Sequence, residues 1–111
     1  MPAFIALRRK ADFDALARSG TARSHRMLVL RSLRTGRPET RVGLSTPRSL
    51  GGAVQRNRVR RRLRELVRER RGSIGAGWDL LLIARPEAAE ASYAQLRVAL
   101  GSLLERSEVG V

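Results

Sequence analysis

The segment from Gly51 to Arg71, GGAVQRNRVRRRLRELVRERR, constrains this 111-residue chain more than any other part of it. It contains nine arginines but only two acidic residues, Glu65 and Glu69. The pattern predicts a helix from about Ala53 to Arg71, and this helix repels itself because like charges four residues apart disfavour one another. A polyanion would relieve that repulsion, so the segment indicates a phosphate-rich partner.

The predicted helix separates into an apolar and a cationic side at about 100° per residue. The apolar side, which should pack on a sheet, contains Val59, Leu63, Leu66 and Val67. The opposite side, here named the arginine stripe, contains Asn57, Arg60, Arg61, Arg64 and Arg68. Glu65 and Glu69 fall to one flank, where we expect them to pair locally without neutralising the stripe. A merely solvated face would mix both signs of charge, so phosphate binding is favoured.

Two features beside the stripe leave alternatives open. Gly51 and Gly52 precede the helix and would let its first N–H groups approach a phosphate, although a flexible turn explains them equally well. Asn57 has three candidate roles: to hydrogen-bond locally, to read a base edge or to hold a hydrated metal ion. Spacing alone does not decide between these roles.

Composition limits the class of protein. The hydrophobic content of 42% indicates a folded chain, and its length fits one domain over residues 1–111. A net charge of +13 allows DNA, RNA or an anionic membrane surface as partner. No cysteine is present, which excludes disulfides, thiol catalysis and cysteine-ligated zinc. The longest apolar run, Leu80 to Ala84, is strand-sized and the N-terminus lacks a signal-peptide layout, so we expect a cytoplasmic protein.

Apolar periodicity predicts an alternation of helices and strands. Three strands are expected, over Met27–Leu33, Arg41–Thr46 and Trp78–Ala84. The turn RTGRPET predicts that the first two strands pair as a hairpin, and the third has the apolar run of a strand buried on both faces. Two further helices are expected, over Arg8–Arg18 and Ala88–Arg106. The order predicts a small α/β (α+β) two-layer sandwich with helices packed on a mixed sheet.

The acidic residues and the single histidine, His25, predict no protein active site. A protein nuclease needs carboxylates that hold two metal ions, or a histidine pair for acid–base chemistry. Asp12 and Asp14 lie two residues apart on a predicted helix, so they point in different directions. We expect them to offset Arg8 and Arg9 rather than to bind metal, and we assign no catalytic residue to the protein.

The stretch from Arg41 to Val67 resembles a known family. RVGLS, a basic loop residue at Arg48, and then LGGAVQRNRVRRRLRE resemble the signature of the bacterial ribonuclease P protein subunit. The likeness extends outward through ADFDALARSGTARSHRMLVL and WDLLLIARPEAAEASYAQLRVALGSLL, in the family's order and at its length. It implies a fold similar to a domain of a small-subunit ribosomal protein, with a left-handed βαβ crossover that physical rules alone would not predict.

The resemblance also implies a function, the removal of the 5′ leader from precursor tRNA. The catalyst would be an RNA that holds magnesium, with one protein per RNA. The protein would bind the catalytic RNA and the leader and would promote magnesium binding. With Arg68 added from the arginine stripe, the expected RNA-binding residues are Arg48, Arg56, Asn57, Arg60, Arg61, Arg64 and Arg68.

Phe13 matches an aromatic residue of the family's central cleft, in which the single-stranded leader lies. A core position in the first helix is an equally good interpretation of this residue. Ala17 and Arg31 stand where the family often has further aromatics. We therefore expect a leader cleft, including Phe13 and Arg31, that is less aromatic and more electrostatic than usual.

Two other classes of nucleic-acid-binding protein fit parts of the pattern. A non-enzymatic structural RNA-binding protein of ribosomal type would share the fold and the charge, but has no reason to carry the Arg-Asn-Arg motif beside an aromatic-bearing N-terminal helix. A helix that reads the DNA major groove should place base-reading side chains among neutral ones, not within a nearly uniform stripe of arginines. The ribonuclease P resemblance therefore ranks first.

Overall fold

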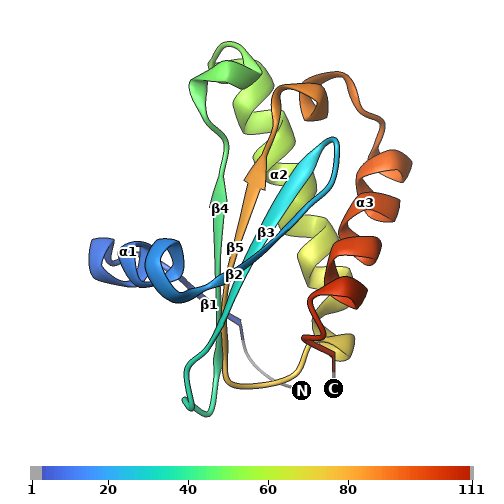
Figure 1. Ribbon diagram of the computed structural model, residues 1–111. Helices are drawn as coiled ribbons and strands as arrows, with labels where there is room; N and C mark the ends of the chain where they lie inside the picture. The colour runs from blue at the N-terminus through green and yellow to red at the C-terminus, as the bar shows by residue number, and fades with distance from the viewer. Residues whose placement is uncertain (1–3, 111) are drawn as a thin grey trace.

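A computed structural model describes residues 4–110, which form a five-stranded mixed sheet and three α-helices (Figure 1). The strands are β1 (Phe4–Ala6), β2 (Thr21–Ser24), β3 (Leu28–Arg34), β4 (Thr40–Ser45) and β5 (Trp78–Ala84). The helices are α1 (Lys10–Ser19), α2 (Ala53–Arg70) and α3 (Tyr93–Arg106), with short 3-10 helices η1 (Arg48–Leu50), η2 (Arg71–Ser73) and η3 (Pro86–Glu90). These elements confirm the predicted sandwich of helices on a mixed sheet. Within residues 4–110, no helix is both long and apolar enough to cross a membrane.

The sheet has the strand order β1-β4-β5-β3-β2. β4 is parallel to β1 and β5, whereas β3 is antiparallel to β5 and β2. The predicted hairpin between Met27–Leu33 and Arg41–Thr46 is wrong, because β5 lies between these two strands. β5 occupies the centre because its apolar run is covered on both faces, and α2 joins β4 to β5 as a parallel crossover.

The two faces of the sheet are covered unequally (Figure 1). α2 and α3 pack on one face, where nineteen buried apolar residues of the described chain form the main core. α1 lies across the other face, where Leu7, Leu16 and Leu81 form a smaller buried cluster. Side chains alternate between faces along a strand, so neighbouring leucines of β5 belong to different clusters.

The main core fixes the orientation of α2. The side predicted to be apolar is buried, with relative exposures of 9% or less at Val59, Leu63, Leu66 and Val67. Because this side faces the sheet, the arginine stripe is turned outward. That part of the sequence prediction is confirmed.

Element ends and short strands differ from the predictions. α3 begins at Tyr93 and not at Ala88, because Ser92 and Gln95 form a reciprocal capping box there. The preceding Pro86–Glu90 is η3. The sequence analysis missed β1 and β2, which have only three and four residues, and every residue of β2 is exposed. A strand without buried positions has no apolar alternation by which to predict it.

Candidate nucleic-acid interface

The outer side of α2 presents the arginine stripe to solvent. Arg61 and Arg64 are exposed, and neither forms a hydrogen bond or ion pair within residues 4–110. Arg60 is half-buried, and its guanidinium donates to the Thr46 hydroxyl at 2.5 Å. Arg60 also donates to the Asn57 amide oxygen at 3.4 Å, which is the local role considered for this asparagine. Hydrogen bonds therefore hold the Arg60 side chain of the stripe in place, whereas the charges of Arg61 and Arg64 are uncompensated.

Glu65 corrects one expectation about the stripe. Its carboxylate accepts a hydrogen bond from Arg68 at 3.0 Å, so it pairs with a member of the stripe instead of leaving all the arginines free. Both side chains are more than half exposed, and ion pairs of this kind contribute little stability. Arg68 therefore remains available to exchange its partner for a phosphate.

Glu69, the other acidic residue of α2, faces away from the stripe toward α3. It accepts hydrogen bonds from Arg97 at 3.2 Å and from the Tyr93 hydroxyl at 2.9 Å. The bond from Arg97, followed by that from Tyr93, lowers the pKa of Glu69 below its usual value. This carboxylate is thus engaged by α3 and does not neutralise the stripe, as expected.

The start of α2 leaves its backbone N–H groups without a side-chain cap. Gly52 is the N-cap residue, and Gly51 has φ +131°, a conformation that side-chain-bearing residues rarely adopt. Arg48, one of the predicted RNA-binding residues, is exposed on η1 just before this turn. Arg56, another predicted RNA-binding residue, is half-buried, and its Nε atom is buried without a hydrogen-bond partner.

The predicted leader-cleft residues lie on the α1 face of the sheet. Gly43, Leu81 and Arg31 are paired across β4, β5 and β3, so they form a row on one face. The Phe13 ring closes one end of the row, since its Cε1 atom lies 3.1 Å from the place that a Cβ on Gly43 would occupy. Adjacent strands are about 4.8 Å apart, which places Arg31 roughly 10 Å across the sheet from Gly43.

Phe13 packs partly into the core, which is one of the two alternatives that the sequence left open, and its leader-cleft role stays a prediction. The ring packs against the small cluster of Leu7, Leu16 and Leu81, yet it is only half-buried. Arg31 is also half-buried, and the two share a face that is distinct from the one covered by α2. The structure therefore separates the predicted sites into two surfaces, one on each side of the sheet.

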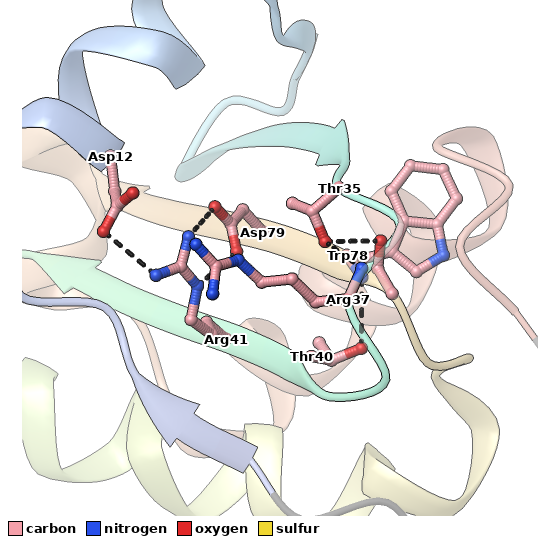
Figure 2. A network of polar contacts seen from close by, with 8 residues as sticks. Asp12, Thr35, Arg37, Thr40, Arg41, Trp78 and Asp79 are labelled. Atoms are coloured by element: carbon pink, nitrogen blue, oxygen red, sulfur yellow. Dashed lines mark hydrogen bonds and ion pairs between the residues drawn. The ribbon is translucent and has the colours of Figure 1, made fainter.

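A buried ion-pair network, which the sequence analysis missed, ties α1 to the sheet. Figure 2 shows the Arg41 guanidinium between Asp12 of α1 and Asp79 of β5. Arg41 donates two hydrogen bonds to Asp79, at 2.8 and 2.6 Å, and one to Asp12, at 3.0 Å. The bonds to Asp79 raise the pKa of Arg41 further above its usual range, against the opposing effect of burial. The guanidinium is charged at every physiological pH.

The network corrects the expected roles of the two aspartates of α1. Asp12 pairs with Arg41 and not with Arg8 or Arg9, and Asp14 accepts a hydrogen bond from Lys10 at 3.3 Å. The sequence contained one signal for this network, which is Asp79. It is a carboxylate within an apolar run, and a buried charge requires a partner.

The carboxylates do not fit a protein-held magnesium site. Within residues 4–110, no group of three or more histidine, cysteine, aspartate or glutamate side chains is close enough to hold a metal ion. Asp12 and Asp79 both accept hydrogen bonds from the Arg41 guanidinium, so neither carboxylate is free to bind a metal ion. Asp12 and Asp79 instead connect α1 to the sheet through Arg41.

Comparison with known proteins identifies the family. The family model described as Ribonuclease P matches residues 1–108. The chain belongs to this family. The ribonuclease P protein component of Roseiflexus sp. is 40% identical over 104 residues, which cover 93% of this chain and 85% of the relative. That of Acidothermus cellulolyticus is 41% identical over 108 residues, covering 96% and 90%.

Solved structures of ribonuclease P proteins have the same fold. The protein from Staphylococcus aureus aligns with a TM-score of 0.86 at 27% identity, covering 94% of this chain and 95% of its own. The protein from Thermotoga maritima aligns with a TM-score of 0.82 at 28% identity, covering 91% and 96%. The fold implied by the sequence resemblance is confirmed by these ribonuclease P structures.

Proposed function

We propose that this chain is the protein subunit of a ribonucleoprotein that removes the 5′ leader from precursor tRNA. The observation that carries the proposal is the arginine stripe, which is held outward by the core and retains uncompensated charge at Arg61 and Arg64. Arginine grips phosphate with two parallel hydrogen bonds, which suits the backbone of a folded RNA. Together with Arg48 and Arg56, this surface would bind the catalytic RNA.

The cleavage chemistry would belong to the RNA. The described carboxylates are scattered or paired with basic residues, and no set of them resembles the metal ligands of a protein nuclease. Magnesium would therefore be held by RNA oxygens. The arginines would aid magnesium binding indirectly, because they bring RNA strands together and relieve the repulsion between phosphates.

The leader would lie on the other face of the sheet. Phe13 offers a half-buried ring on which a base can stack, and Arg31 offers a positive charge on the same face. Ala17, exposed on α1, provides no second ring. Leader binding would depend on one stacking residue and one charge, with little preference for base sequence.

Cleavage of a precursor tRNA at low magnesium concentration, by a bacterial ribonuclease P RNA with and without this protein, tests the proposal. We expect the protein to restore cleavage at the mature 5′ end and the double variant Arg61→Ala/Arg64→Ala to lose most of this effect. The control Arg97→Ala/Arg106→Ala removes the same charge from α3 and should behave as the unmodified protein. Tight RNA binding without restored cleavage would instead favour a structural RNA-binding protein.

A further inference from the structure

A groove of about 500 Å³ lies between α2 and the sheet edge formed by β1 and β4. Its wall is formed by arginines of α2 and of the turn that follows, namely Arg60, Arg64, Arg68 and Arg71. Its floor contains the apolar side chains of Val67, Ala6, Val42 and Leu44. Ile5, Leu7 and Gly43 also line the groove, although strand alternation directs their side chains toward the α1 face. The groove thus combines a cationic side with an apolar base.

The groove exists because β1 carries a small residue opposite the helix. Ala6 pairs with Val42 in the parallel β1–β4 register, so both side chains lie on the face that α2 covers. Val42 is packed against the main core, whereas Ala6 is exposed at the sheet edge. A larger side chain at Ala6 would fill the space beneath the arginines.

The wall of the groove is strongly and uniformly charged. Helical geometry places Arg60, Arg64 and Arg71 within about 40° of one another, next to the buried Val67. No acidic side chain is among the residues that line the groove. Within residues 4–110, neither Arg64 nor Arg71 has a hydrogen-bond or ion-pair partner. The free protein therefore concentrates unpaired guanidinium groups beside an apolar surface.

We propose that this groove binds an unpaired ribonucleotide of a single-stranded RNA segment. The guanidinium groups of the wall contact its phosphates, and the base or ribose lies on the apolar floor. The twelve residues from Arg60 to Arg71 span about 16 Å, enough for more than one phosphate. A double helix cannot place a base against the apolar floor, because its bases are stacked and paired. Only its backbone reaches a concave surface of this size. The inference rests on the proposed function for the source of the RNA.

Filling the groove without changing its charge gives the sharpest test. The variant Ala6→Leu adds apolar volume to the floor, and Ala94→Leu makes the same change at an exposed position of α3. Binding of a fluorescent single-stranded oligouridylate and of an RNA hairpin is measured by anisotropy, and circular dichroism verifies that each variant is folded. We expect Ala6→Leu to weaken single-strand binding by about tenfold and to leave hairpin binding and the salt slope unchanged.

A charge variant keeps the test decisive if Ala6→Leu fails to fold. Arg71 lines the groove but lies outside the arginine stripe, and Arg58 is exposed on α2 away from the groove. Arg71→Ala should therefore weaken single-strand binding more than Arg58→Ala does. Equal effects of the two arginine variants, or unchanged binding in a folded Ala6→Leu, would overturn the proposal.

Photocrosslinking separates the groove from the α1 face, which is the other candidate single-strand surface. An oligouridylate that carries 4-thiouridine should crosslink to β1, β4 or α2 peptides, and Ala6→Leu should remove these crosslinks. Crosslinks confined to α1 and β3 would overturn the proposal. Repeating the experiment with ribonuclease P RNA alone and with a leader-bearing precursor tRNA then identifies which RNA supplies the nucleotide. Restored cleavage without groove crosslinks would reject only the groove, whereas groove crosslinks without restored cleavage would reject only the proposed function.

Discussion

On one face of the sheet, α2 and α3 are held by a core of nineteen buried apolar residues. On the other face, α1 is held by a cluster of three buried leucines, one of which is its own Leu16, and by an ion-pair network. Burial of apolar area is non-directional and requires no particular orientation of polar groups. The network depends on the directions of three side chains and on the charge of Arg41. The two faces therefore fix their helices by different forces.

The difference explains how each face presents its surface. Because the apolar side of α2 supplies its stability, every position on the outer side is free to carry a charge. α1 has less apolar contact, so Asp12, one residue before Phe13, must be fixed by Arg41 for the Phe13 ring to keep its place over Gly43. Arg41 is thus a positioning residue for the α1 face.

The largest effect is expected from breaking the network. Arg41→Ala leaves Asp79, whose side chain is 4% exposed, as a buried charge without its partner. We expect a loss of about 3–5 kcal/mol in the free energy of unfolding, measured by urea denaturation. Lys10→Ala breaks the exposed pair with Asp14 and should change stability by less than about 0.5 kcal/mol. Similar small losses in both variants would show that the network does not hold α1.

The main core should respond to truncation of a leucine. Leu63 is fully buried, so Leu63→Ala should lower the free energy of unfolding by about 2–5 kcal/mol. The salt dependence of RNA binding by the folded variant should remain unchanged, because no charge is removed. A change in that slope would mean that the core also adjusts the position of the arginine stripe.

The arginine stripe should affect binding and leave stability nearly unchanged. Arg61→Ala and Arg64→Ala should each reduce the slope of log affinity for ribonuclease P RNA against log salt concentration by about one. Arg97→Ala, at an arginine engaged by Glu69, provides the matched control. Unchanged slopes in both stripe variants would remove these residues from the RNA interface.

The smallest effect is expected at the exposed contact between α2 and α3. Glu69 has a lowered pKa in the folded protein, so its carboxylate stabilises the fold above the usual carboxyl range. This contribution is lost as the pH falls through the lowered folded-state pKa. Glu69→Gln should therefore reduce the thermal midpoint slightly at neutral pH, and this difference should shrink as the pH falls below the usual carboxyl range. Glu105→Gln, at an exposed residue of α3, should show no such pH dependence.

Helical periodicity explains why α2 could be predicted from the sequence. Val59, Leu63, Leu66 and Val67 recur on one side, so both the buried side and the orientation of the stripe followed from residue spacing. β5 was predicted for a similar reason, because its uninterrupted apolar run requires cover on both faces. These elements have local patterns that match their final environments.

Strand order and the two surfaces could not be predicted in the same way. The neighbours of β5 depend on the crossover through α2, which no local pattern encodes, and so the hairpin prediction failed. Arg41 and Asp79 are 38 positions apart, and only the β4–β5 pairing makes them partners. The groove likewise depends on Ala6 and Arg64, which belong to distant segments.

The most direct test of the division between the two faces is the affinity of the reconstituted ribonucleoprotein for precursor tRNA with and without its leader. We predict that Phe13→Ala and Arg31→Ala weaken binding of the leader-bearing precursor only, and leave the affinity of the protein for the catalytic RNA unchanged. Arg64→Ala should instead weaken the association of the protein with the catalytic RNA. If Phe13→Ala weakened that association as much as Arg64→Ala does, or left leader binding intact, the assignment of separate RNA partners to the two faces would be wrong.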